Sequence, residues 1–303
     1  MDNVATQLVS GWGVAFVRGA AQAGLFLLLA PGVNGAIKRF KAALQNRRGP
    51  SVVQPYRDLD KLFRKEAVIS RHASWVVRVA PYVTFAAYLS AGLQLPLLGS
   101  ASMRPGAFLT FIYLLALGRV AMALAALDTG SNFGGMGASR ELAVSVLVEP
   151  ALFLSLAGLA FDHGVTSRPL AAAAFAVAAI AEMGRIPVDN PDTHLELTMI
   201  HEGMLLEYSG RHLALLTWAA QVKQLLMLTL LASLFLGPWP AGVGGLVALA
   251  FPLYLVKVVL LGLGFGLVEF LFAKMRFFRL PRLLGASFLL AALSVSSALF
   301  LRG

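Results

Sequence analysis

The sequence contains no cysteine, and this absence excludes several classes of site from the chain. Without thiolates, its 303 residues cannot form a disulfide bond or hold an iron–sulfur, nickel–iron or thiolate-bound zinc centre. Charged residues are also scarce, because Asp, Glu, Lys and Arg together make up only 13% of the chain, about half the fraction found in soluble domains. We therefore expect no cofactor in this chain, and any electron-transfer metal must lie on a partner.

Hydrophobic residues make up 58% of the sequence, and the mean hydropathy is +0.76. One soluble globule could not bury so much apolar surface, so the composition indicates a multi-spanning membrane protein. Eight apolar segments are long enough to cross a bilayer as helices, near residues 11–34, 75–97, 106–127, 140–162, 169–188, 211–236, 242–273 and 283–302. We predict an all-α polytopic membrane protein that forms a single membrane domain over residues 1–303, with short amphipathic cytoplasmic helices.

Two of the predicted connections carry most of the formal net charge of +10. Residues 35–74 contain ten Lys or Arg against three acids, and residues 274–282 contain four and no acid. With eight spans, both connections lie on one side, which the positive-inside rule makes cytoplasmic. Both termini are then expected to face outward. We attribute the excess of basic residues to this topology. It therefore does not indicate nucleic-acid binding, and we expect no nucleic-acid partner.

The first basic connection contains a candidate surface helix, QPYRDLDKLFRKEAV, at residues 54–68. Pro55 suits a first helical turn, and Tyr56, Leu59 and Phe63 share an apolar side opposite the charged residues. This pattern is typical of a helix that lies in the membrane interface, either as a lipid anchor or as a docking element. The polar candidates on it are Gln54, Asp58, Lys61, Lys65 and Glu66.

A second candidate element is the acidic stretch 187–210, which holds five of the fifteen acids of the chain. A break at Pro191 and a capping box from Thr193 to Glu196 predict a short helix that ends near Gly210. The motif H-E-x-x-H is absent because residue 205 is leucine, so we expect no metal site here. The candidate docking or coupling residues are Asp189, Asp192, His194, Glu196, His201, Glu202 and Glu207.

Charged residues within the predicted spans carry the most specific signal. Each costs about 2.5–3.5 kcal/mol on insertion scales, so the presence of several in one bundle calls for an explanation. They could be buried ion pairs that fix helix register, or a hydrated chain that passes protons; for the set as a whole we favour the relay. The candidates for this pathway are Glu149, Glu182, Arg185, Lys223, Lys257 and Glu269, with Arg78 and Arg119 also inside spans and Glu141 assignable to a helix N-terminus.

Four stretches together match a known family: RRGPSVVQPYRDLDKLFRKE (47–66), ASRELAVSVLVEP (138–150), AEMGRIPVDNPDTHLELTMIHEGMLLEYSG (181–210) and AKMRFFRLPRL (273–283). Nearly end to end, the chain resembles the membrane subunit that respiratory complex I, in its quinone-site H-type subunit, shares with group 4 [NiFe]-hydrogenases. The A-E-x-x-R-x-P-x-D pattern is common to both branches. Its continuation, DNPxTHLELTMIHEGMxLEYSG, resembles the formate hydrogenlyase and hydrogenase-4 branch.

The resemblance implies a non-catalytic anchor in a bacterial or archaeal inner membrane, between antiporter-like subunits and the hydrogenase large and small subunits that hold [NiFe] and iron–sulfur centres. It assigns a charged-channel role to Glu149, Glu182, Arg185 and Asp189, with proton or sodium as the ion. Complex I relatives carry a denser E-x-E-x-E run where this chain has Asp192, His194 and Glu196. The H-type subunit of a quinone-reducing complex, a free-standing transporter and an inert anchor stay open as alternatives.

Overall fold

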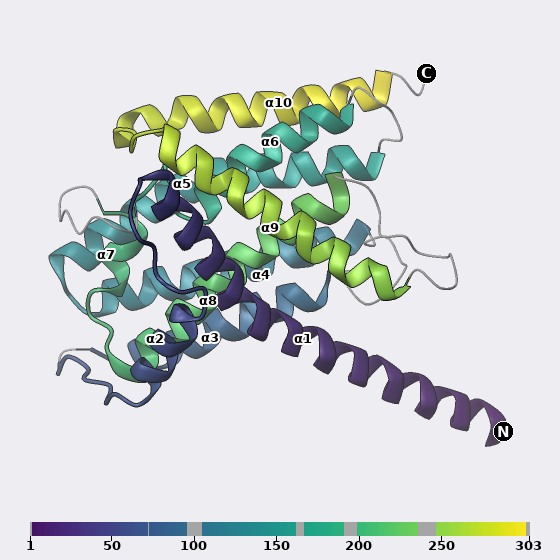
Figure 1. Cartoon of the computed structure of the whole chain (residues 1–303), viewed down its shortest axis with the longest axis horizontal. Helices are drawn as coiled ribbons and strands as arrows, with labels where there is room; N and C mark the ends of the chain where they lie inside the picture. Colours follow the sequence, from purple (N-terminus) through teal and green to yellow (C-terminus); the bar gives the residue numbers. More distant parts are fainter. Residues whose placement is uncertain are drawn as a thin grey trace.

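The computed structural model describes residues 2–71, 73–95, 105–161, 167–190, 199–235 and 247–300. Over these residues the chain forms helices and connections and contains no strand (Figure 1). The α-helices are α1 (Asp2–Leu44), α2 (Gln54–Phe63), α3 (Trp75–Leu93), α4 (Pro105–Asp128), α5 (Asn132–Phe161), α6 (Ser167–Glu182), α7 (His201–Leu205), α8 (Gly210–Leu230), α9 (Val247–Leu271) and α10 (Leu280–Phe300). A π-helix, η1 (Leu231–Phe235), continues α8, and a 3₁₀ turn, η2 (Phe277–Arg279), precedes α10.

Seven of the helices described are long and apolar enough to span a membrane: α1, α3, α4, α5, α8, α9 and α10. This confirms the predicted all-α polytopic fold. The predicted fifth span, 169–188, corresponds to α6, which has only 16 residues. Its length of about 24 Å falls short of the roughly 30 Å hydrocarbon layer. The chain beyond Glu182 turns instead of continuing as helix.

Helix α6 nevertheless packs inside the bundle, against α5 and α10. Ser294 Oγ of α10 donates to Ser167 O at 2.9 Å, and Ser287 Oγ donates to Ala174 O at 2.8 Å. The numbering falls on one helix as it rises on the other, so α6 and α10 are antiparallel. A small residue also lets α5 approach α10 closely, because a Cβ added to Gly158 of α5 would lie 2.8 Å from Ser294 Oγ.

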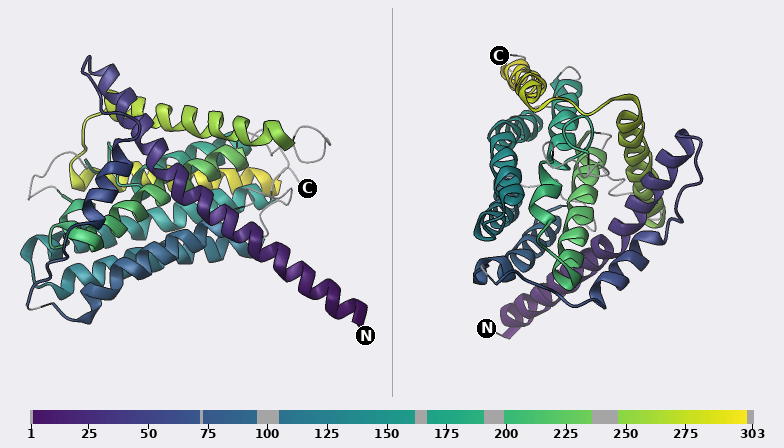
Figure 2. Two further views of the ribbon diagram at one scale, coloured as in Figure 1. Left: turned by 60° about the horizontal axis from the view of Figure 1, so that its bottom comes forward. Right: turned by 90° about the vertical axis from the view of Figure 1, so that its left-hand side faces the viewer.

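Helix α1 is 43 residues long, about 65 Å, and its first turns project beyond the other helices (Figures 1 and 2). Its later part packs against α8 and α9. Gln22 Nε2 donates to the carbonyl oxygens of Gly92 and Leu95 at 2.7 and 2.5 Å, which ties α1 to the end of α3. The start of α1 and the end of α10 lie at one end of the bundle, opposite α2 and α7 (Figure 1).

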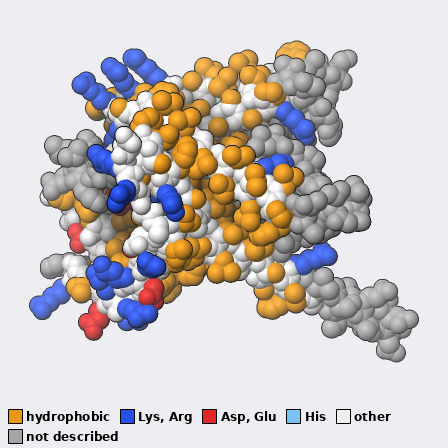
Figure 3. All heavy atoms as spheres, in the orientation of Figure 1, with side chains coloured by type: hydrophobic (Ala, Val, Ile, Leu, Met, Phe, Trp, Pro, Cys, Tyr) orange, Lys and Arg blue, Asp and Glu red, His pale blue; other side chains and the backbone are white. Residues whose placement is uncertain are grey.

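The end with α2, α7 and the connection between α9 and α10 is here called the basic end. Lys and Arg side chains gather along it, whereas apolar side chains cover the middle of the visible face (Figure 3). The segments that form it are far apart in sequence but joined by hydrogen bonds. Met275 N, for example, donates to Pro187 O at 2.8 Å.

The predicted surface helix is shorter than expected, because α2 ends at Phe63 and leaves Lys65 and Glu66 outside it. Its apolar side faces protein: α2 packs against α1 and α8. Phe63 makes an edge contact with Trp218 at a centroid distance of 6.0 Å, and the Tyr56 hydroxyl donates to Leu28 O. A helix seated on the bundle by its apolar side is a docked part of the fold, so its apolar side is not a lipid anchor.

Gly210 joins the acidic stretch to α8. Because it has no side chain, the segment that follows α2 can pack directly against its backbone. Its φ is +53°, and a Cβ built there would overlap the carbonyl oxygen of Glu66.

We expect Gly210→Ala to destabilise the chain by more than the roughly 1–3 kcal/mol that a strained backbone conformation costs. Thermal unfolding of the purified protein in detergent measures this. Gly285→Ala is the matched control, because no atom lies within 4 Å of the added Cβ; equal melting temperatures for both variants would contradict the prediction.

Candidate functional site

The centre of the buried charge network is Arg119 on α4, whose side chain is 4% exposed. One guanidinium nitrogen donates to Glu149 of α5 and another to Glu182 of α6. A third carboxylate, Glu141 of α5, lies 3.7 Å from Arg119 Nε. One arginine therefore joins three carboxylates from two neighbouring helices.

Lys223 on α8 is the second cation of this network. Its Nζ lies 3.6 Å from Glu182 Oε1 and 5.4 Å from the centre of the Tyr88 ring, a cation–π arrangement. At 3.6 Å the lysine does not hydrogen-bond Glu182 Oε1, which has no hydrogen-bond partner among the residues described. Glu182 thus keeps one buried oxygen that can accept a proton or a water hydrogen.

The composition of this network bears on what it can do. Two cations, Arg119 and Lys223, face three carboxylates, Glu141, Glu149 and Glu182. With every group ionised the sum is two minus three, a net charge of −1. An uncompensated charge is costly in a low-dielectric site, so the extra carboxylate sets this network apart from a balanced set of buried ion pairs.

A second network lies nearer the basic end and joins α1, α9 and the turn after α6. Glu269 of α9 is 3.1 Å from Lys41 Nζ and 3.5 Å from a terminal nitrogen of Arg185. Arg185 also donates to Gln224 Oε1 at 2.9 Å. Because Gln224 follows Lys223 on α8, consecutive residues of one helix contact the two networks.

Asp189 fastens the start of the acidic stretch to the bundle. Lys274 Nζ lies 2.7 Å from Asp189 Oδ1, and Oδ2 accepts hydrogen bonds from the backbone N–H groups of Ile200 and His201 at 3.3 and 3.0 Å. Arg140 contributes a further tie, donating to Met199 O at 3.0 Å. These bonds connect the acidic stretch to α5 and to the connection between α9 and α10.

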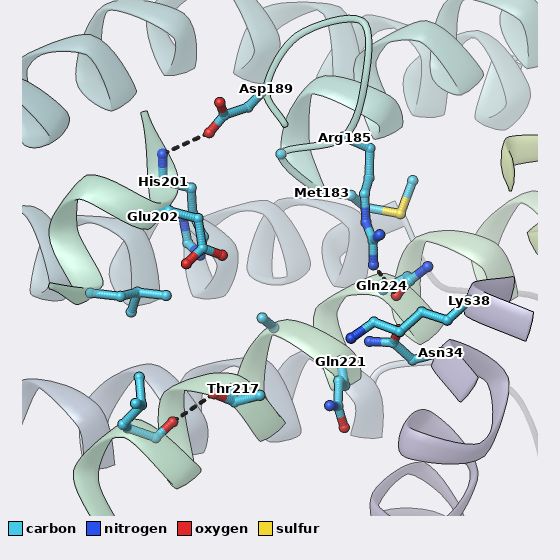
Figure 4. A pocket seen from close by; sticks show the side chains of 14 residues that line it. Asn34, Lys38, Met183, Arg185, Asp189, His201, Glu202, Thr217, Gln221 and Gln224 are labelled. Carbon is cyan, nitrogen blue, oxygen red and sulfur yellow. Dashed lines mark hydrogen bonds between the residues drawn. The ribbon is translucent and has the colours of Figure 1, made fainter. Parts of the chain in front are cut away.

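A cavity of about 340 Å³ opens beside the acidic stretch. In Figure 4, Asp189, His201 and Glu202 lie on one side of it and Asn34, Lys38, Gln221 and Gln224 on the other. Asn34 Oδ1 and Gln221 Oε1 are buried and have no hydrogen-bond partner in the described part of the chain. The cavity is therefore lined by polar groups able to bind water or a small polar molecule.

His201 borders both this cavity and a small neighbouring pocket of about 10 Å³. Thr84 and Tyr88 line the small pocket, and Leu205 and Ala220 line both spaces. Because Tyr88 faces Lys223, the small pocket borders a side chain that contacts the buried network.

The remaining candidates of the acidic stretch have different positions. Glu202 is half-buried in α7 and lines the cavity, whereas Glu207 is exposed. Tyr208 is buried and its hydroxyl donates to Val77 O at 3.1 Å; burial, together with nearby Asp128, raises the pKa of this hydroxyl, so it stays a donor. Asp192, His194 and Glu196, with the predicted capping box, lie outside the described residues.

The candidates on α2, and Lys257 in α9, do not line the cavity. Gln54 donates to Asp58 Oδ1 at 2.9 Å, and Lys61, Lys65 and Glu66 are exposed. Lys257 is half-buried in α9, twelve residues before Glu269, about 18 Å along the helix. Among the residues described, no group of three His, Cys, Asp or Glu side chains could hold a metal ion.

Sequence reasoning underrated three members of the networks. Arg119 was recognised as an in-span charge, but nothing in the sequence marks it as the residue that joins three carboxylates. Glu141, expected near a helix N-terminus, lies nine residues inside α5 and pairs with Arg119. Lys41 was grouped with the basic connection, although α1 continues to Leu44 and carries it to Glu269.

Comparisons with known proteins agree with this architecture. The model of the NADH dehydrogenase family matches residues 20–299. Hydrogenase-4 component C of Escherichia coli K12 is 37% identical over 95% of this chain and 96% of its own length, and formate hydrogenlyase subunit 4 of the same organism is 36% identical over 92% and 97%.

More distant relatives include the H-type subunit of the NADH-quinone oxidoreductase of Thermomicrobium roseum, 30% identical over 66% of this chain and 71% of its own length. Among solved structures, a chain of the membrane-bound sulfane sulfur reductase, an archaeal respiratory membrane complex, superposes with a TM-score of 0.80 at 20% identity, covering 94% of this chain and 99% of that one. That likeness concerns the fold alone.

Proposed function

Because this chain belongs to the NADH dehydrogenase family, we propose that it is the membrane subunit of a complex of the formate hydrogenlyase or hydrogenase-4 type. In this function it is non-redox: it anchors a hydrogenase arm and contributes a charged pathway for protons or sodium ions. The observation that carries the proposal is Arg119, buried and joined to Glu149 and Glu182 on two other elements of the bundle.

The pathway begins at the cavity beside the acidic stretch. A proton entering there reaches His201, which also borders the small pocket in front of Tyr88. From Tyr88 and Lys223 it passes to the free oxygen of Glu182. Arg119 stays protonated and holds Glu149, the next acceptor, in the same network as Glu182. The Glu149 side chain is 37% exposed, the most open of the carboxylates in this network. It is the point where the pathway leaves this chain, towards an antiporter-like subunit.

The basic end is the docking side for the hydrogenase arm. By the positive-inside rule it faces the cytoplasm and both termini face outward. The large and small hydrogenase subunits, which would carry the [NiFe] and iron–sulfur centres, meet the exposed parts of α2 and of the acidic stretch. Asp189 and its partners would pass a displacement of that stretch to α5 and α9.

Glu202 and Glu207 test this docking role. We expect the double variant Glu202→Gln/Glu207→Gln to insert normally but to lose the hydrogenase arm or uncouple it, since two acidic groups of the acidic stretch are removed. Co-purification of the arm with a tag on this chain measures the first effect, and hydrogen evolution per ion moved measures the second. Asp58→Asn/Asp60→Asn makes an equal charge change on α2, the other part of the docking side, and shows whether the loss is specific to the acidic stretch. Normal yield with normal coupling in the acidic-stretch variant would refute its docking role.

A second function is favoured by one observation, the volume of the cavity. At about 340 Å³ it lies at the lower end of the range for small-molecule sites, roughly 300–1,000 Å³. This would suit an H-type subunit of a quinone-reducing complex. The lining weighs against this alternative, because Lys38, Arg185 and Asp189 are charged and such sites are mostly apolar.

Gentle extraction of native membranes through a tag on this chain separates the two functions. We expect nickel, iron–sulfur signals and hydrogen evolution from a low-potential donor to accompany the chain. Quinone reduction without nickel would overturn the hydrogenase assignment and favour the quinone alternative.

A further inference from the structure

The connection between α9 and α10 carries three arginines that no acid among the described residues neutralises. After Glu269 the sequence contains no further Asp or Glu, while Arg276, Arg279 and Arg282 follow within thirteen residues. All three arginines are exposed, and none forms an ion pair within the described residues. Lys274 is different, because it pairs with Asp189.

An exposed aromatic side chain lies among these arginines. Phe278, in η2, is 90% exposed, the highest value among the large hydrophobic residues described. Leu271 and Phe272, at the end of α9, are exposed as well. Exposed apolar side chains of this kind are unfavourable in water and mark a site that binds a membrane or another protein.

The position of this surface indicates what covers it. Exposed apolar side chains continue from it along α9, at Leu267 and Phe270, and along α10, at Phe288 and Leu289. Both helices qualify as membrane spans, so the short connection between them lies at the level of the bilayer surface. Lys and Arg side chains gather at the edge where α10 begins (Figure 3).

We propose that Phe278, Arg276, Arg279 and Arg282 form a binding site for anionic phospholipids. The guanidinium groups bind the phosphate of the headgroup by charge-assisted hydrogen bonds, and Phe278 inserts at the boundary between headgroups and acyl chains. The site uses none of the residues of the proposed proton pathway.

Another surface at the same end makes the contrast clear. On α2 the basic residues alternate with acids, and Arg64 is paired with Asp60 at 2.9 Å. The apolar side of α2 is turned towards α1 and α8. Acids stand among the bases of that surface, and Leu59 on its apolar side is buried, so it serves as an internal comparison.

The test uses the assembled complex in vesicles, with Phe278→Trp as a fluorescent reporter. The chain has four native tryptophans. Their fluorescence is measured in the complex that lacks the substitution and is subtracted as background. Quenching by brominated phosphatidylglycerol is compared with quenching by brominated phosphatidylcholine. We expect the site to bind phosphatidylglycerol about tenfold or more tightly than phosphatidylcholine. The reason is that each arginine near a membrane surface raises the affinity for anionic lipid by about fivefold. An excess of inorganic phosphate should leave the quenching unchanged.

Adding Arg276→Gln, Arg279→Gln and Arg282→Gln to the reporter should remove the preference for phosphatidylglycerol. The control triple Arg57→Gln/Lys61→Gln/Lys65→Gln, on and just after α2, removes the same charge from the same end and should leave the preference intact. Equal quenching by both lipids in the reporter complex overturns the site, and so does the absence of quenching by either, which would mean that protein covers Phe278. Both results are measured in the Phe278→Trp complex with its arginines intact, so the test does not depend on assembly of the triple variant.

Discussion

Replacing Arg119 with methionine is expected to abolish accumulation of the assembled complex. The change leaves Glu141, Glu149 and Glu182 facing one another with Lys223 as the only cation of the network. Removing one partner of a buried ion pair costs about 3–5 kcal/mol, and here one residue serves three carboxylates. The measurement is the amount of chain in the membrane and in the purified complex.

Two further variants make this result specific. Arg119→Lys keeps the charge but cannot reach several carboxylates at once, so it should restore only part of the yield. Arg78→Met removes an exposed arginine of α3 that has no ion pair among the described residues, and its yield should equal that of the unmodified chain. A normal yield of Arg119→Met would show that the network contributes little to stability.

Replacing Glu149 with glutamine should leave assembly intact and remove most of the coupled activity. Glutamine occupies nearly the same volume and can still accept a hydrogen bond from Arg119, but it cannot take up a proton at ordinary pH. Groups that transfer protons in enzymes typically contribute about 10²–10⁴-fold, and we expect a loss near the lower end of this range, about 10²-fold. The measurement is hydrogen evolution by the complex in sealed vesicles.

The assembled complex must be quantified in the same samples, so that lost activity is not mistaken for lost protein. Asp60→Asn on α2 is a suitable control, since it removes an exposed carboxylate at a distance from the pathway. Unchanged hydrogen evolution and ion movement in Glu149→Gln would exclude this carboxylate from the pathway. In that case the network would act only as a buried ion-pair cluster that fixes helix register.

The sequence predicted the helices well because hydrophobic length determines them. Seven of the eight predicted spans correspond to helices that can cross a membrane, and α6 is the exception in length. Its shortness follows from the turn after Glu182, which carries Arg185 towards Glu269 and Asp189 towards Lys274. Those are tertiary contacts, and hydropathy along one segment cannot anticipate them.

The sequence singled out several charged residues of the networks but not the contacts that join them. Glu149, Glu182 and Lys223 stood out because charge inside a span is costly, and the structure brings all three together around Arg119. Arg185 and Glu269 stood out for the same reason but form a separate network with Lys41. Helix length and crossing decide which charges meet, and neither can be derived from spacing along the chain.

The interpretation of α2 shows the same limit. Its apolar stripe was recognised correctly, but an apolar stripe is compatible with lipid and with protein alike. Only the edge contact of Phe63 with Trp218 and the bond from Tyr56 to Leu28 O identify the bundle as what it faces.

The measurement that tests the central claim most directly is ion movement by the purified complex in sealed vesicles during hydrogen evolution. If the network around Arg119 is a pathway, a proton or sodium gradient should form in step with hydrogen, and it should collapse on addition of the matching ionophore. Hydrogen evolution at full rate with no gradient of either ion would contradict the account and leave the chain as an inert membrane anchor.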